Sequence, residues 1–270
     1  KASTILMPIL IILIVCISIF CATRPGALAG VKYYLLPDIK HFSATTVLAA
    51  MGQLFYSMSL AMGIMITYGS YMKKEDDLRD SVRKIEIFDT VVALLAGLMI
   101  VPSVFAFSGG SKEALSKGPS LMFVTMPKVF NSMKIGSLIG AGFFILVLFA
   151  VLSSAISLLE TNVSIICDKL HWSRKKSTVV ATLYCLIVGG LISLGYGPLS
   201  FIKIIGMNLL DFFDFISNSV LMPIVAMLTC IFIGYIVKPK TIIDEVELGG
   251  KTFKEKKFYV VMLKYVAPVC

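Results

Sequence analysis

Charged residues are scarce in this sequence. They make up 15% of the 270 residues, whereas hydrophobic residues make up 57%. Soluble domains carry about a quarter charged residues, so this composition excludes a water-soluble globular protein. The chain is therefore predicted to be an integral membrane protein.

Residues that commonly carry catalysis are also few. The two histidines, His41 and His171, lie in predicted loops, and neither pairs with a serine or cysteine at a motif spacing. The six cysteines lie mostly within or at the ends of apolar runs and show neither a disulfide framework nor a metal-ligand spacing. No phosphate-binding loop is present. We therefore predict that the protein is not an enzyme.

Long apolar runs separated by short charged loops dominate the sequence. Outer-membrane barrels show alternating segments of about ten residues, which this pattern excludes. Crossing the hydrocarbon takes about 20 apolar residues per helix, so we predict an all-α bundle forming a single integral membrane domain over residues 1–270. The predicted spans are residues 4–22, 46–72, 87–107, 135–167, 178–196 and 209–237, with a truncated seventh at 258–270.

The ends of the chain and one long loop stand out. The first apolar run contains Pro8, continues into the next loop and lacks a small-residue cleavage pattern, which excludes a signal peptide. The chain starts without Met at the edge of a span, so we expect a fragment of a larger protein. Apolar and aromatic residues punctuate segment 108–134, which predicts a structured outer loop.

The net charge of +9 is distributed unevenly between alternate loops. If Lys1 is inside, the inside loops hold fifteen Lys and Arg residues and the outside loops hold eight. Cytoplasmic loops carry the excess of positive charge, so we predict a multi-pass protein of the inner (plasma) membrane with its N-terminus in the cytoplasm. The positive charge thus indicates topology and contact with the lipid bilayer, and no nucleic-acid partner is expected.

The span at 46–72 is rich in small and polar residues. Gly63 follows Ser57 and Ser59 near its middle, and glycine loosens a helix. Unwound backbone at membrane depth survives only where protein or a watery cavity covers it, so one hypothesis is a helix broken near 59–63 that lines a binding cavity. The alternative is that the small residues only pack against a neighbouring helix. The segment alone leaves the two hypotheses about even.

The span at 135–167 carries a stripe of small and hydroxyl residues. The members recur at steps of three and four, which places them on one helical face; they are Ala150, Ser153, Ser154, Ser157, Thr161 and Ser164. Their oxygens suit Na⁺ or an ordered water. Taken alone, the stripe is better explained by hydroxyls that bond their own helix and help it to pack.

Four carboxylates lie in or near the spans. An intramembrane carboxylate costs at least about 2.5 kcal/mol at the bilayer centre, so it faces a cavity or a partner. Asp89, Asp211 and Asp214 lie near span ends, where an interfacial position explains them as well. Glu160 lies among Leu158, Leu159 and Val163 on the hydroxyl-bearing helix and is harder to explain without a partner.

Three motifs resemble the bacterial branch of the neurotransmitter:sodium symporter family, which transports amino acids. They are GQLFYSMSLAMG at 52–63, DTVVALLAG at 89–97 and AVLSSAISLLE at 150–160; FVTMP at 123–127 resembles the family's fourth outer loop. The resemblance covers essentially the whole chain, from about the fifth span to the start of the eleventh. It implies an inverted-repeat transporter bundle with one helix broken at mid-membrane.

The resemblance also implies roles for individual residues. Ser57 and Asp89 correspond to ligands of a first sodium site. The carbonyl of Ala150 and the hydroxyls of Ser153 and Ser154 correspond to the second. Asp214 corresponds to an outer-gate carboxylate, and Glu160 and Gly63 are assigned gating or structural roles. The residues at positions that line the family's amino-acid pocket are Tyr56, Ser57, Ser59, Met62, Ser154 and Leu158.

Two departures from the family pattern affect the expected mechanism. Asp89 stands where many relatives have Asn, and it could supply the negative charge that chloride supplies elsewhere, so no chloride requirement is expected. Spans one to four, the missing N-terminal partners of this segment, are absent from the sequence, so this chain alone should not transport.

The resulting prediction is Na⁺-coupled symport of a small neutral amino acid by the intact protein, with an apolar pocket lined in part by Met62 and Leu158. One alternative is another cation- or proton-coupled transporter of the same inverted-repeat fold. A non-transporting membrane scaffold subunit is the second.

Overall fold

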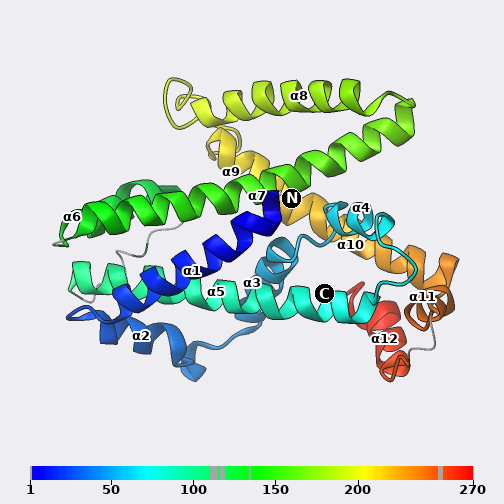
Figure 1. Ribbon diagram of the computed structural model, residues 1–270, viewed down its shortest axis with the longest axis horizontal. Coiled ribbons are helices and arrows are strands. Elements are labelled where there is room, and N and C mark those ends of the chain that lie inside the picture. Colours follow the sequence, from blue (N-terminus) through cyan, green and yellow to red (C-terminus); the bar gives the residue numbers. More distant parts are fainter. Residues whose placement is uncertain (1, 110–114, 116–118, 134, 249–251, 270) are drawn as a thin grey trace. The chain divides into compact units, whose positions relative to one another are not determined.

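The computed structural model describes residues 2–109, 115, 119–133, 135–248 and 252–269 (Figure 1). Within these ranges the regular elements are helices, apart from an isolated β-bridge between Ile204 and Met207. The predicted all-α fold class is confirmed. Residues 110–114, 116–118 and 134 of the predicted outer loop lie outside the described residues, as do Lys1 and Cys270.

In chain order, the α-helices are α1 (Ala2–Ala22), α2 (Ala27–Leu35), α3 (Ala44–Ser57), α4 (Ile64–Ser70), α5 (Leu78–Ser108), α6 (Met126–Asn131), α7 (Gly136–Leu170), α8 (Arg174–Leu194), α9 (Leu209–Asp214), α10 (Met222–Ile231), α11 (Pro239–Val246) and α12 (Lys256–Val261). A 3₁₀ turn, η1 (Ile39–His41), precedes α3. Single π-helical segments are η3 (Leu121–Thr125), η4 (Phe215–Leu221), η5 (Phe232–Val237) and η6 (Met262–Val266).

Among the described residues, four helices are long and apolar enough to cross a membrane. They are α5, α7, α8 and the run Leu209–Val237, in which α9, η4, α10 and η5 follow one another without a break. A fifth candidate is a bent pair, Met7–Ala22 with Ala27–Leu35, whose axes differ by 117°. The span boundaries predicted from the sequence stay predictions.

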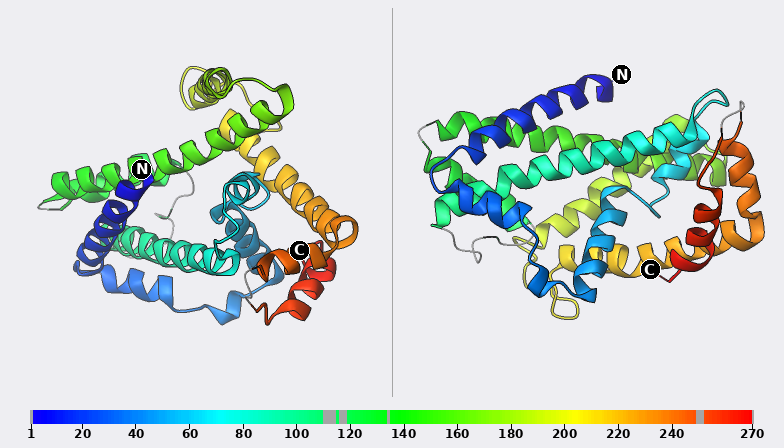
Figure 2. Two further views of the ribbon diagram at one scale, coloured as in Figure 1. Left: turned by 45° about the vertical axis from the view of Figure 1, so that its right-hand side comes forward. Right: turned by 90° about the horizontal axis from the view of Figure 1, so that it is seen from below.

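The chain divides into two compact units, Lys1–Phe42 with Glu86–Ala155, and Ser43–Ile85 with Ile156–Cys270. We call them unit 1 and unit 2. In unit 1, α1 packs beside α5, α6 and α7 (Figures 1 and 2). Ile14, Phe143 and Met126 are at most 1% exposed in this core.

The second helix of unit 1 packs closely on α5. A Cβ added at Gly30 would lie 2.7 Å from the Cα of Pro102, so only glycine fits there. Tyr33 stacks on Phe105, with ring centroids 5.1 Å apart. The approach of the two backbones therefore holds the bent pair α1–α2 against α5.

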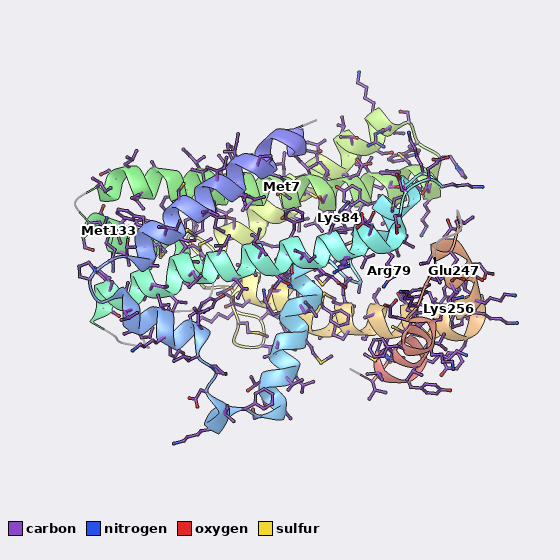
Figure 3. All side chains as sticks on the ribbon, turned by 60° about the horizontal axis from the view of Figure 1, so that its bottom comes forward. Met7, Arg79, Lys84, Met133, Glu247 and Lys256 are labelled. Carbon is purple, nitrogen blue, oxygen red and sulfur yellow. The ribbon has the colours of Figure 1, made fainter. Side chains whose placement is uncertain are left out.

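In unit 2, hydrogen bonds and ion pairs hold the described ends of the segment between α11 and α12. Glu247 accepts a hydrogen bond from Lys256 at 2.6 Å and another from the backbone N–H of Phe253 at 3.0 Å. Glu255 pairs with Arg79 near the start of α5 at 2.7 Å. Figure 3 shows Arg79, Glu247 and Lys256 gathered at this end of unit 2. The segment therefore has a defined structure at both of its described ends.

Candidate functional site

The segment between α3 and α4 is the most unusual backbone of unit 2. Helix α3 ends at Ser57 and α4 begins at Ile64. Between them Ser59 and Ala61 have φ angles of 54° and 59°, and Gly63 has φ 78°. Left-handed backbone is rare for residues other than glycine and costs about 1–3 kcal/mol at each. The helix predicted at 46–72 is therefore interrupted where the sequence indicated, at a strained turn.

Gly63 anchors this turn to α7. A Cβ at Gly63 would lie 3.0 Å from Cγ2 of Thr161, which is only 4% exposed. The two interpretations of the small residues in this span therefore both hold in part: the helix is broken, and one glycine of the break packs tightly against a neighbouring helix. The cavity itself stays a prediction.

Hydroxyls of the α7 stripe bond to carbonyls of their own helix, as Ser153 and Thr161 show. Ser153 Oγ donates to the carbonyl of Ala150 at 2.8 Å, and Thr161 Oγ1 donates to the carbonyl of Ser157 at 3.0 Å. The self-bonding predicted for such stripes is thus present. The same contact brings the oxygens of Ala150 and Ser153, two predicted sodium ligands, side by side in unit 1.

The remaining predicted ligands are spread over both units. Ser57 and Tyr56 are exposed on α3, and Ser59 and Met62 are half-buried in the break. Ser154 and Leu158 lie four residues apart on α7, so they share a face of that helix. Asp89 is half-buried on the part of α5 that belongs to unit 1, whereas Ser57 belongs to unit 2. The first sodium site therefore stays a prediction.

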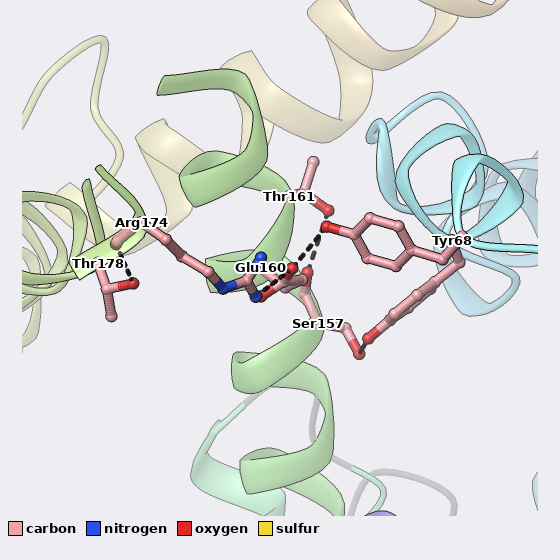
Figure 4. Close-up of polar contacts among 7 residues, drawn as sticks. Tyr68, Ser157, Glu160, Thr161, Arg174 and Thr178 are labelled. Carbon is pink, nitrogen blue, oxygen red and sulfur yellow. Dashed lines mark hydrogen bonds and ion pairs between the residues drawn. The ribbon is translucent and has the colours of Figure 1, made fainter. Parts of the chain in front are cut away.

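Glu160 is the centre of a polar cluster in unit 2. Its carboxylate accepts hydrogen bonds from the Tyr71 hydroxyl at 2.7 Å and from the Arg174 guanidinium at 2.6 Å to each oxygen (Figure 4). The Glu160 side chain is 20% exposed, and that of Arg174 is 65% exposed. A carboxylate predicted to need a partner thus has two. The contact joins α7, the start of α8 and the end of α4.

A second tyrosine ties α4 to α7 beside this cluster. Figure 4 shows Tyr68 reaching Ser157, and the two hydroxyl oxygens are 2.9 Å apart. Tyr68 and Tyr71 are three residues apart, so they leave α4 on the same face.

Sequence reasoning missed Tyr68, Tyr71 and Arg174. A tyrosine pair at helical spacing beyond a broken helix was the available signal for the first two. Nothing local linked Arg174 to a carboxylate 14 residues earlier, because the contact needs the turn between α7 and α8.

Asp214 lies at the C-terminal end of α9 and is exposed. It accepts a hydrogen bond from the side chain of Asn218 at 2.6 Å. The arrangement orients the carboxylate along its own helix and leaves its outer-gate role a prediction.

Apart from the Asp89 carboxylate, the predicted ion ligands are neutral hydroxyl and carbonyl oxygens. Within the described ranges, no group of three His, Cys, Asp or Glu side chains could hold a metal ion. Na⁺ in transporters is held by hydroxyls and by carbonyls freed from broken helices. Ala150, Ser153 and the turn after Ser57 offer oxygens of this kind.

This chain is similar to known proteins along nearly its whole length. Residues 2–270 match the profile described as "Sodium:neurotransmitter symporter family". An uncharacterized sodium-dependent transporter of Bacillus subtilis, YhdH, is 34% identical over 272 residues, which cover 100% of this chain and 59% of that protein. The sodium- and chloride-dependent glycine transporter 1 of Xenopus laevis is 29% identical over 257 residues, covering 91% of this chain and 39% of that protein.

A solved structure is also similar. The crystal structure of MhsT in complex with L-phenylalanine matches 98% of this chain with a TM-score of 0.86 and 37% identity. The match covers 59% of the MhsT chain. The sequence therefore spans 59% of the length of YhdH and of MhsT, and 39% of the length of the Xenopus transporter.

Proposed function

The chain belongs to the sodium:neurotransmitter symporter family, and from this membership we propose that a full-length transporter containing it couples Na⁺ entry to uptake of a neutral amino acid. The family resemblance predicted from the motifs is thereby confirmed. The observation that carries the proposal is the interrupted helix between Ser57 and Ile64, with left-handed residues at Ser59, Ala61 and Gly63. Broken helices free backbone groups for ions and for charged ends of a substrate.

The second sodium site is assigned to Ala150, Ser153 and Ser154. The carbonyl of Ala150 and the hydroxyl of Ser153 are in contact at 2.8 Å, which supports a shared ligand position. A hydroxyl that donates its proton keeps lone pairs, so Ser153 can still bind a cation.

The first sodium site is assigned to Ser57 and Asp89. A carboxylate ligand brings its own negative charge to the ion. This supports independence from chloride, because the charge that an anion would otherwise supply is already present on the chain.

The amino-acid pocket is assigned to Tyr56, Ser59, Met62, Ser154 and Leu158, with Ser57 beside them. The bound L-phenylalanine named for MhsT supports an amino-acid substrate. The apolar side chains of Met62 and Leu158 and the ring of Tyr56 favour a neutral, hydrophobic side chain.

Two acidic residues are assigned to gates. Glu160 has its partners within this chain, Tyr71 and Arg174, and the bonds between them would stabilise one closed conformation. Asp214 is assigned to the outer gate, with an arginine on the first span as its expected partner. The proposed setting is the cytoplasmic membrane, with the loops at 73–84, 169–176 and 238–257 inside.

Coupling follows if ion and substrate each favour the same conformation. A ligand can shift a conformational equilibrium only by its difference in affinity for the two states, and linkage makes the effect reciprocal. A substrate carboxylate near the first Na⁺ would give that coupling a direct electrostatic contact.

The test is uptake of labelled L-phenylalanine into proteoliposomes holding the full-length transporter. Wild-type uptake should require an inward Na⁺ gradient and should not require a proton gradient. Ser153→Ala with Ser154→Ala removes two ligand hydroxyls and should raise the Na⁺ concentration for half-maximal uptake by about tenfold, which corresponds to 1.4 kcal/mol.

Ser164→Ala is the matched control, because it removes a hydroxyl from α7 outside the assigned site. An unchanged Na⁺ response in the double variant would sink the assignment of the second site. Uptake driven equally well by a proton gradient would favour a proton-coupled transporter of the same fold. A protein that binds no amino acid, with or without Na⁺, would favour a scaffold.

A further inference from the structure

A pocket of about 420 Å³ lies in unit 2 where η5, α11 and the α12–η6 helix meet, well away in sequence from the residues assigned to transport. Its walls combine apolar residues with lysines. They are Gly234, Tyr235, Lys238, Pro239, Lys240, Ile243, Val260 and Lys264.

Three positive charges line this pocket. Lys238 lies at the turn between η5 and α11, Lys240 on α11 and Lys264 on η6. None of them forms an ion pair with a carboxylate in the part of the chain that the structure describes. The carboxylates nearest in the sequence, Asp244 and Glu245, are exposed on α11 and do not line the pocket. The pocket therefore has a net positive lining.

Lys264 lies within the segment predicted as the truncated seventh span, residues 258–270. It lies eight residues into the helix that starts at Lys256, about 12 Å along the axis. An ammonium group inside a span is costly unless it reaches water or a partner. Its stem packs against Gly234, where an added Cβ would be 3.4 Å from Lys264 Cγ, and its Nζ lies 5.3 Å from the centre of the Tyr235 ring. The side chain thus extends toward the pocket instead of toward lipid tails.

The other two lysines lie where the apolar span ends. Lys238 follows Val237, the last residue of η5, and has an uncommon φ of 71° at the sharp turn into α11. Helix α11 then presents Ile242, Ile243 and Val246 on its half-buried side and charged residues on its exposed side. Such short amphipathic helices lie at the boundary between headgroups and acyl chains.

We propose that this pocket binds the phosphate headgroup of an anionic phospholipid. The three ammonium groups would donate charge-assisted hydrogen bonds to the phosphate oxygens, and Ile243 and Val260 would contact the first carbons of the acyl chains. Exposed Ile236 and Val261 beside the pocket offer an apolar surface for the tails. The proposal requires only that the protein spans a membrane, so it stands or falls independently of Na⁺-coupled transport.

Native mass spectrometry of the full-length transporter in detergent tests the proposal. Phosphatidylglycerol and phosphatidylcholine are titrated separately, and inorganic phosphate is added as a competitor. The wild type should bind phosphatidylglycerol about tenfold more tightly than phosphatidylcholine, because each lysine near an anionic headgroup contributes favourably. Replacing Lys238, Lys240 and Lys264 together with Gln should abolish this preference.

The control is Lys73→Gln with Lys74→Gln and Lys169→Gln, which removes the same charge from other proposed inside loops and should keep the preference. Ile243→Trp fills the pocket without changing charge and should also lower phosphatidylglycerol binding. Equal loss in the two triple variants would show diffuse attraction and overturn the pocket. Full displacement of the lipid by millimolar phosphate would show a free-anion site and overturn the lipid assignment. If Ile243→Trp binds phosphatidylglycerol as tightly as the wild type does, the pocket is not the binding site.

Discussion

Gly63 shows how one residue meets two requirements at once. Its φ of 78° lies in the left-handed region, and its missing Cβ leaves room for Thr161 Cγ2 at 3.0 Å. Neighbouring Ser59 and Ala61 take similar angles although they have side chains. The turn is therefore held by its surroundings and not by local preference, which is typical of binding sites.

Gly63→Ala should destabilise the full-length transporter by about 1–2 kcal/mol, because a Cβ in left-handed backbone meets both the chain and Thr161. Gly69→Ala is the control, since a Cβ at Gly69 in the same helix would meet nothing within 4 Å. Thermal midpoints in detergent measure both. If Thr161→Ser fails to recover part of the loss in Gly63→Ala, the contact with Thr161 is not the cause.

Glu160 makes short hydrogen bonds, but its partner Arg174 is mostly exposed to solvent. Glu160→Gln removes the charge that Arg174 binds and should destabilise by about 1 kcal/mol, a modest value because the arginine is mostly exposed. Glu245→Gln, on an exposed face of α11, is the control. A double-mutant cycle with Arg174→Gln measures the coupling. Additive losses in that cycle would contradict a functional pair.

At the scale of elements, the contacts of Glu247 between α11 and α12 are expected to depend on pH. The hydrogen bond from Lys256, followed by that from the backbone N–H of Phe253, holds the pKa of Glu247 below its ordinary value of 4.5. A carboxyl whose folded pKa is lowered adds stability above 4.5, and this stability is lost as pH falls through the lowered pKa.

Acidification below pH 4.5 should therefore loosen this segment while it remains packed at neutral pH. Limited proteolysis between residues 247 and 256, with an acid-active protease across this pH range, measures the change. Glu247→Gln should be cleaved readily at every pH, and Glu245→Gln should follow the wild type. A pH profile that Glu247→Gln leaves unchanged would assign the effect to other groups.

At the scale of the whole molecule, helices α5 and α7 each run through both compact units. Both also carry residues assigned to the ion sites, Asp89 on α5 and Ala150, Ser153 and Ser154 on α7. A conformational change in the complete transporter would therefore act on ligands that sit on long, continuous helices.

Charge balance at the first ion site gives a prediction for the complete transporter. Wild-type uptake should be unchanged when chloride is replaced by gluconate, because in the proposed first sodium site the Asp89 carboxylate would supply the negative charge. Asp89→Asn removes that charge and should make uptake depend on chloride. Uptake assays in the two anions measure this, with Asp80→Asn as a control on the same helix. Wild-type uptake that stops without chloride would refute the assignment.

The sequence alone indicated the helical fold class, because long apolar runs demand helices in lipid. Three motifs, and not composition, indicated the family. For the span at 46–72, Gly63 beside small polar residues marked where a helix can unwind, but composition alone left a broken helix and simple packing about even. The same composition made Glu160 conspicuous among leucines, since a carboxylate in such surroundings needs a partner.

Only the tertiary structure decided which side chains bind the Glu160 carboxylate. Tyr71 and Arg174 reach Glu160 from helices on either side of it in the sequence, and no local pattern records that approach. The pocket around Lys264 likewise arises where three elements meet, with two lysines more than 20 residues before the third. Contacts of this kind depend on how helices pack, and packing is a property of side-chain shape in three dimensions that periodicity along the chain does not encode.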